Sequence, residues 1–397
     1  MIIGNGIVIT NDSNNTFIEN GAVLVRGNII EDVGGFEELK KAYPEEEVID
    51  VDGKVIMPGM ICAHSHIYSA YARGMSVAKP QRNFFEILEN LWWNLDRKLT
   101  LEDVKLNALT TYIESIQNGV TTLIDHHSGP NSVKGSLFAI AEAAKKLGIR
   151  TSLCYEVSDR DGKEITLREI EENINFIKEI QKDDNGDMIK GLFGLHASFT
   201  LSNETLYKVR EAMEGVYDGY HIHVAEGIQD QYDSLEKYGK RVVERLHDFG
   251  ILGKHTIAVH GVHINQREIE ILKETDTSIV HNPESNMNNA VGAPPVVSMI
   301  KQGLRVGLGT DAYTNDMFES MKVANILQSH QLCDPTVGFN ETKIMQFDNN
   351  PKILRKYFKR DLGVIAKGAY ADIITDVSRA ILSSQNNHVA ISIINDI

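Results

Sequence analysis

The chain contains little cysteine for its length, with three residues in 397, at Cys62, Cys154 and Cys333. Their odd number and wide spacing exclude a disulfide framework and a cysteine zinc knuckle as the basis of the fold. Thiols left free in this way are typical of a reducing compartment, so we expect a cytoplasmic protein.

Long apolar runs and positive charge are also scarce. The N-terminus lacks a basic segment followed by an apolar one, and no apolar run is long enough to span a bilayer, so we expect no membrane partner. The 40 lysines and arginines are outnumbered by 55 aspartates and glutamates, which gives a formal net charge of −15. Binding to a nucleic-acid backbone relies on clustered basic side chains, and this composition argues against it.

The pattern of the chain changes after its first segment. Residues 1–56 contain short β-branched runs broken by Asn-Gly or Gly turns, which predict a small β-domain. Residues 57–363 alternate apolar and helical segments, and residues 364–397 look like strands returning to the first domain. The chain stops at HVAISIINDI, and we expect this small domain to be incomplete.

The middle region contains eight strand candidates separated by segments of helical apolar spacing. One helical segment begins after Thr100, a suitable N-cap, and ends at Gly119, a suitable C-cap. The pattern predicts an α/β protein, a (β/α)8 TIM barrel with a small β-sandwich domain formed by the N- and C-terminal segments. The strand candidates are 60–66, 119–127, 150–157, 191–200, 219–226, 255–263, 277–286 and 304–313.

Histidines are concentrated at the ends of these strands. Of the 14 in the chain, ten lie there: His64, His66, His126, His127, His196, His221, His223, His260, His263 and His281. His64 and His66 are two residues apart on one strand, so both point into the barrel. Buried imidazoles need a partner, and a cation is a suitable one. Several imidazoles with one carboxylate, for which Asp311 is the candidate, are typical ligands of Zn²⁺ or Fe²⁺.

The remaining candidates differ in their expected roles. Glu226 follows His223 by three residues, so its carboxylate could reach back over the metal. His196 and His281 are open between contact with the substrate and structural support. Four further histidines are expected to pack against metal ligands or backbone carbonyl groups. They are His126, His127, His221 and His263.

A long insertion follows the first barrel strand. Residues 76–100 carry Phe84, Phe85, Trp92 and Trp93, and long loops at this rim of a barrel are often lids. Its aromatic side chains could cover a heteroaromatic substrate, for which we select Trp92, or they could serve packing alone.

Several motifs resemble those of one known family. The segment PGMICAHSH resembles the first-strand signature of the amidohydrolase superfamily. Other motifs are similar to those of its cytosine-deaminase and chlorohydrolase branch, at 223–226 (HVAE), 260–263 (HGVH), 281–287 (HNPESNM) and 307–311 (GLGTD). Within that branch, GLHASFTLS, DHHSGPNSVKGSL and HNPESNMNNAVGAPPV resemble the SsnA-like aminohydrolases, a group associated with selenium-dependent metabolism.

The resemblance implies a hydrolase with one divalent metal ion, Zn²⁺ or Fe²⁺. Its ligands would be His64, His66, His223 and Asp311. The fourth strand ends GLHASFT without the lysine that bridges two metals in the binuclear branch. The metal would make hydroxide available from water, with Asp311 as the general base. Glu226 would protonate a ring nitrogen, and His260 would hydrogen-bond the water or the developing oxygen.

Three functions remain open from the sequence. The first is a deaminase of a small heterocyclic amine, and the second is a hydrolase of the same fold that releases chloride or an alkylamine. The third is a non-catalytic scaffold or maturation protein in selenium-linked metabolism. A guanine-specific role is not expected, because the fourth-strand region lacks the arginine expected beside guanine.

Two further expectations rest on the resemblance. Ala312 stands where family members usually have a glycine after the last-strand aspartate. A homo-oligomer is expected on the resemblance alone.

Overall fold

The computed structural model describes residues 1–14, 16–77, 79–182, 186–217, 219–375, 380–385 and 388–393. The chain divides into two compact units, one of Met1–Met60 with Lys359–Ile397 and one of Ile61–Phe358. The sequence placed these divisions a few residues away, after residues 56 and 363. Part of the predicted C-terminal segment 364–397, including the end where we expected incompleteness, lies outside the described residues.

The smaller unit contains a mixed sheet with the strand order β15-β5-β1-β2-β3, in which β4 also pairs with β1. A C-terminal strand pairs antiparallel with β5, so both ends of the sequence contribute to this sheet as predicted. Instead of extending this sheet, β16 (Ala380–Gln385) and β17 (His388–Ile393) pair with each other as a hairpin. The strands of the sheet are β1 (Ile2–Ile9), β2 (Phe17–Arg26), β3 (Ile29–Gly35), β4 (Val48–Asp50), β5 (Val55–Pro58) and β15 (Ile373–Thr375).

Strand β2 shows why this sheet has two apolar faces. Val23 and Val25 belong to one buried cluster, and Ala22 and Leu24 belong to another, as the two-residue period of a strand requires. The second cluster is covered by helix α1 (Phe36–Ala42). The sheet is therefore buried on both sides of its central strands.

The larger unit is a closed barrel of eight parallel strands. Hydrogen-bonded ladders join β6 to β7 and β8, and join β10 through β14. Two parallel bridges, Val157 to Leu195 and Ser65 to Asp311, connect these sheets and complete the predicted ring. The strands are β6 (Met60–Ser65), β7 (Val120–Asp125), β8 (Arg150–Leu153), β10 (Phe193–Ala197), β11 (Tyr220–Val224), β12 (Ile257–His260), β13 (Ser278–His281) and β14 (Val306–Leu308), with the short β9 (Ile189–Gly191) beside β8.

The barrel strands end earlier than the sequence predicted, because the chain turns sharply at their C-terminal ends. Ala225, His260 and Asp311 have φ values of 48°, 72° and 60°, a region that non-glycine residues rarely adopt. Such conformations gather at functional sites, where the surrounding structure must hold them in place. Here they occur within three of the motifs that the sequence singled out.

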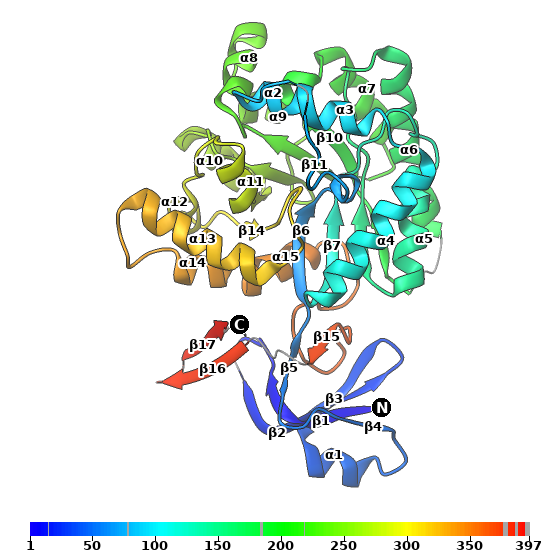
Figure 1. Cartoon of the computed structure of the whole chain (residues 1–397), viewed down its shortest axis with the longest axis vertical. Helices are drawn as coiled ribbons and strands as arrows, with labels where there is room; N and C mark the ends of the chain where they lie inside the picture. Colours follow the sequence, from blue (N-terminus) through cyan, green and yellow to red (C-terminus); the bar gives the residue numbers. More distant parts are fainter. Residues whose placement is uncertain are drawn as a thin grey trace. The chain divides into compact units, whose positions relative to one another are not determined.

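Helices surround the barrel strands (Figure 1). The start of α4 agrees with the sequence, since the Thr100 side chain caps it through a reciprocal pair of hydrogen bonds with Asp103. No helix within the described ranges is long and apolar enough to cross a membrane. The helices are α2 (Phe84–Ile87), α3 (Trp93–Asp96), α4 (Leu101–Gln117), α5 (Ser136–Leu147), α6 (Lys163–Lys182), α7 (Asn203–Met213), α8 (Ile228–Tyr238), α9 (Val242–Asp248), α10 (Gln266–Glu274), α11 (Pro283–Asn288), α12 (Val296–Lys301), α13 (Met317–Leu332), α14 (Phe339–Lys343) and α15 (Asn350–Leu354).

The insertion after β6 forms consecutive helical segments at the rim of the barrel. Helix α2 continues through a π-helical turn (Leu88–Trp92) into α3. Phe84 and Leu88 are buried against Val262 and Val291, and Phe199 packs beside them. The insertion is therefore anchored by its aromatic and aliphatic side chains at the end of the barrel where the strand termini meet.

Candidate active site

The histidines of β6 and β11 converge inside the barrel with an aspartate that follows β14. The Nε2 atoms of His66 and His223 are 3.2 Å apart, and His66 Nε2 lies 3.3 Å from Asp311 Oδ1. Donor atoms of His64, His66 and Asp311 all lie within 4.8 Å of one another, and so do those of His64, His223 and His260. Five side chains from four separate places in the sequence thus form one buried cluster.

Hydrogen bonds to backbone carbonyl groups fix the proton positions on two of these rings. The Nδ1–H of His66 donates to the His126 carbonyl oxygen at 2.6 Å, and that of His223 donates to the His196 carbonyl oxygen at 2.9 Å. A neutral imidazole carries one N–H, so the Nε2 atom of each ring bears a lone pair. Burial lowers the pKa of both histidines and keeps them neutral. Two lone pairs that face each other at 3.2 Å are suited to bind one cation.

A longer chain of hydrogen bonds leads to the same result for His64. The Cys154 thiol donates to the Asp125 carbonyl oxygen, so its sulfur is left to accept from His221 Nδ1, which lies 3.6 Å away. His221 Nε2 then accepts from His64 Nδ1 at 2.9 Å. The remaining nitrogen, His64 Nε2, is buried and has no partner in the part of the chain described here. Its lone pair is the third available to a metal.

The strand that precedes Asp311 packs closely against β6. A side chain at Gly309 would meet the backbone oxygen and nitrogen of His64 at 2.8 and 2.9 Å, so only glycine allows this approach. The approach brings the Asp311 carboxylate beside the His66 ring. The donor set of three neutral imidazoles and one carboxylate fits a divalent zinc or iron ion.

His260 and Glu226 form a second pair at the edge of this cluster. The Asn286 amide nitrogen lies 3.0 Å from His260 Nδ1 and donates to it, so the ring hydrogen is on Nε2. The Nε2 atom lies 3.3 Å from Glu226 Oε2 and 3.6 Å from Asp311 Oδ2 and forms no hydrogen bond among the described residues. Burial lowers the pKa of His260 to about 4, so the ring is neutral at pH 7. Burial, and next the charge of Asp311, raise the pKa of Glu226 well above its ordinary value, so this carboxyl group can hold a proton.

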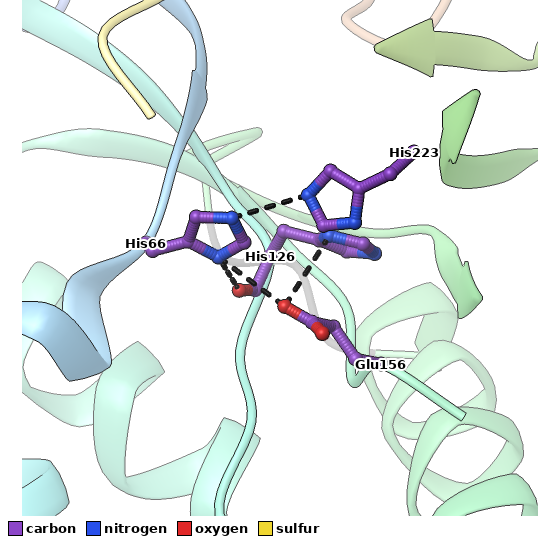
Figure 2. Close-up of side chains that lie close together, drawn as sticks. All are labelled: His66, His126, Glu156 and His223. Atoms are coloured by element: carbon purple, nitrogen blue, oxygen red, sulfur yellow. Dashed lines mark hydrogen bonds and ion pairs between the residues drawn. The ribbon is translucent and has the colours of Figure 1, made fainter. Parts of the chain in front are cut away.

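Glu156, which the sequence analysis did not single out, lies on the other side of His66. Figure 2 shows its carboxylate beside the rings of His66 and His126, with Oε1 3.3 Å and 3.6 Å from their Nδ1 atoms. Its donors and those of His66, His126 and His223 lie within metal-binding range of one another. However, His66 Nδ1 already carries a hydrogen, and the lone pair on Nε2 faces Asp311. The ring therefore favours Asp311 over Glu156 as the carboxylate ligand.

A cavity opens beside the cluster and ends at the helical insertion. Aromatic side chains from the insertion and from the turn after β10 line it together with several carboxylates. No lysine or arginine is among the described residues that line it. The lining residues are His66, Tyr68, Phe84, Leu88, Trp92, Trp93, Asp96, Glu156, His196, Ala197, Phe199, His223, Glu226, Asp230, Asn289, Asp311 and Ala312.

Two of the three predicted substrate residues line the cavity. Trp92 and His196 line the cavity, whereas His281 is buried at the end of β13 and is not among the lining residues. We therefore leave His281 out of the proposed substrate site. His126 and His221 lie against the ligand candidates. Their two rings stack on each other, with centroids 4.5 Å apart. Asp96, Glu156, Asp230, Asn289 and Phe199 are cavity residues that the sequence analysis did not single out as site residues.

A buried carboxyl group on helix α6 gives a pH-dependent prediction. Glu169 is 1% exposed and accepts a hydrogen bond from the Ser158 backbone N–H at 2.9 Å. Burial raises the pKa of Glu169 from 4.5 to about 8, so the fold favours its protonated form. Its contribution to stability is fully present below pH 4.5 and is lost as the pH rises through about 8.

We expect Glu169→Gln to become more stable relative to the wild type as the pH rises from 5 to 8. Between the two pKa values, the difference in free energy of unfolding should change by about 1.4 kcal/mol per pH unit at most. Denaturant unfolding at each pH measures it. Glu171→Gln, an exposed position on the same helix, serves as the control. A constant difference between Glu169→Gln and wild type across this range would contradict the prediction.

Comparisons with known proteins agree with this fold. Residues 55–395 match the amidohydrolase family, and residues 21–45 match an imidazolonepropionase-like composite domain of bacteria. The 5-methylthioadenosine/S-adenosylhomocysteine deaminase of Thermococcus sibiricus is 34% identical over 379 residues, covering 94% of this chain and 84% of that protein. The 5′-deoxyadenosine deaminase of Methanosarcina mazei is 32% identical over 383 residues, covering 94% and 83%.

Solved structures with lower sequence identity share the fold. A zinc-bound adenosine deaminase from Xanthomonas campestris superposes with a TM-score of 0.81 at 23% identity, over 94% of this chain and 84% of that one. A guanine deaminase from C. acetobutylicum gives 0.80 at 19% identity, over 94% and 90%. The zinc complex of atrazine chlorohydrolase TrzN from Arthrobacter aurescens gives 0.76 at 23% identity, over 94% and 86%.

Proposed function

The chain belongs to the amidohydrolase family, and we propose that it removes the 6-amino group of an adenine nucleoside with an uncharged 5′ substituent. At the coarser level, the chain is a metal-dependent hydrolase that deaminates a heterocyclic amine. The single observation that carries the finer proposal is the cavity, which is lined by aromatic side chains and carboxylates, with no lysine or arginine among its described lining residues.

The proposed metal centre uses His64, His66, His223 and Asp311. Three buried lone pairs and one carboxylate support this set, and zinc is the ion that we propose on the chemistry of these donors. A bound divalent ion lowers the pKa of water towards neutrality, which supplies a nucleophile at pH 7. One ion is proposed because the end of β10 provides no lysine to bridge two.

The acid–base residues act around the reacting carbon. Asp311 is proposed to accept a proton from the attacking water, and Glu226 to donate its proton to the ring nitrogen next to that carbon. The His260 Nε2–H is proposed to donate a hydrogen bond to the incoming oxygen. A C–O bond forms as the ring nitrogen takes the proton from Glu226. The proton that Asp311 accepted then passes to the amino group, the hydroxyl proton of the adduct returns to Glu226, and the C–N bond breaks to release ammonia and leave a carbonyl group. The raised pKa of Glu226 and the assigned hydrogen on His260 support these roles.

The cavity supports uncharged nucleosides among the substrates named for the relatives. Aromatic side chains such as Trp92 and Phe199 suit a purine ring and an apolar 5′ group. A phosphate or a substrate carboxylate would meet Glu156 and Asp230, and no lysine or arginine is among the described lining residues to pair with it. The Asp96 carboxylate is already paired with Arg160. We therefore propose 5′-deoxyadenosine and 5′-methylthioadenosine ahead of S-adenosylhomocysteine and adenosine 5′-monophosphate. Trp92 and His196 are the proposed contacts retained from the sequence.

An ammonia-release assay over a substrate panel tests this proposal. We expect turnover of the two uncharged nucleosides, with kcat/KM about 100-fold or more below theirs for adenosine 5′-monophosphate, because burying an unpaired charge is costly. Guanine and a chlorinated triazine complete the panel. Preference for the phosphate would overturn the assignment of substrate class, and chloride release from the triazine without any deamination would favour the alternative hydrolase.

The cellular setting is also a proposal. Cys62, Cys154 and Cys333 are free thiols, which supports a cytoplasmic location. A small heterocyclic substrate is the proposed partner, and self-association stays a prediction from the family.

A further inference from the structure

We propose that Asn286 and Asn289, at one end of helix α11, are positioning residues that set the hydrogen-bonding states of His260 and Glu226. This inference rests on the proposed function, since it assumes that these two side chains carry the acid–base chemistry. Neither asparagine belongs to the metal-ligand candidates, and only Asn289 lines the cavity.

Asn286 acts on His260 through the chemistry of its amide group. Its Nδ2 is 3.0 Å from His260 Nδ1, and an amide NH2 group can only donate a hydrogen bond. His260 Nδ1 must therefore accept, which leaves the single ring hydrogen on Nε2. Asn282 places a second, longer amide donor 3.5 Å from the same ring nitrogen. Asn282, Asn286 and His260 are all buried, so water is kept away from this arrangement.

Asn289 acts on the other partner. Its Nδ2 donates to Glu226 Oε1 at 3.0 Å and also lies 3.3 Å from Ser285 Oγ. Because Oε1 accepts from the amide, the Glu226 proton is directed to Oε2. Oε2 is the oxygen that lies 3.3 Å from His260 Nε2, so the acidic hydrogen is held on the side of the reacting groups.

One short helix, α11, holds both amides in place. Asn286 and Asn289 are three residues apart, so they lie on the same side of the helix. Pro283 occupies the first turn, and the Glu284 carboxylate accepts a hydrogen bond from Ser320 on α13 at 2.8 Å. Helix α11 is thus anchored on one side while it presents two donors to the active site on the other.

Double-mutant cycles test whether each asparagine acts through its partner. In an otherwise wild-type chain, Asn286→Ala and Asn289→Ala should each lower kcat about 10- to 100-fold, a usual effect of removing a supporting hydrogen bond. KM and metal content should change little. In a His260→Ala chain, Asn286→Ala should change the residual rate less than about two-fold, and the same holds for Asn289→Ala in a Glu226→Gln chain. Asn288→Ala, an exposed neighbour on α11, is the control with unchanged kcat.

Equal losses in both backgrounds, or a fall in metal content, would show a merely structural role and overturn the inference. Unchanged kcat in both single variants would overturn it as well. Asn289 is only half-buried, so its variant keeps the test available if Asn286→Ala fails to fold. A wild-type chain that deaminates no member of the panel would refute the proposed function itself. A working wild type without coupling in the cycles would refute this inference alone.

Discussion

Glu226→Gln is expected to lower kcat by about 10²–10⁴-fold, the usual contribution of a positioned acid or base. The reason is that glutamine keeps the size and the hydrogen bond from Asn289 but has no acidic proton to give. Burial and the nearby Asp311 raise the pKa of Glu226 and hold that proton in place near neutral pH. The metal should remain bound, because Glu226 is not one of the proposed ligands, which are His64, His66, His223 and Asp311.

Steady-state kinetics with 5′-deoxyadenosine and elemental analysis of the same preparation check this prediction together. Glu236→Gln, an exposed change on helix α8, should retain full activity and serves as the control. Full activity of Glu226→Gln would refute the acid role. Loss of metal from that variant would show that Glu226 serves the metal centre.

Asp311→Asn is expected to weaken metal binding and turnover at the same time. Its carboxylate lies 3.3 Å from His66 Nε2 through Oδ1, while Oδ2 lies 3.6 Å from His260 Nε2. An amide is a poorer ligand for a divalent ion and cannot accept the proton from the attacking water. We expect kcat to fall by about 10²–10⁴-fold even at saturating zinc.

Glu156→Gln provides a matched comparison for the ligand assignment. Both carboxylates lie 3.3 Å from a nitrogen of His66, but Glu156 faces the nitrogen that already carries hydrogen. Metal content per chain should therefore fall in Asp311→Asn and stay unchanged in Glu156→Gln. The opposite result would assign the metal to the cluster of His66, His126, Glu156 and His223 drawn in Figure 2.

The sequence predicted the barrel and the positions of the main candidates because both follow from local patterns. Alternating apolar segments identify strands, and His64 and His66 share a face through the two-residue period. The ends of parallel strands meet at one rim, which is why His223 and Asp311 could be grouped with them.

The residues that the sequence did not indicate depend on contacts between distant elements. Glu156 has no motif around it, and its place beside His66 follows only from the pairing of strands around the ring. Asn286 and Asn289 lie in a recognised motif, but their partners are set by how α11 packs. The sequence also did not predict the turns with positive φ at His260 and Asp311, because a pattern of apolar residues does not indicate a turn. The strands are therefore shorter than predicted.

The proposed metal centre is tested by titrating metal-free protein with zinc and measuring ammonia release from 5′-deoxyadenosine. We expect no activity without metal and a rise that saturates at about one zinc per chain, the stoichiometry of a single site. Ammonia release that is independent of metal, or no ammonia release from any adenine nucleoside at full zinc loading, would contradict it.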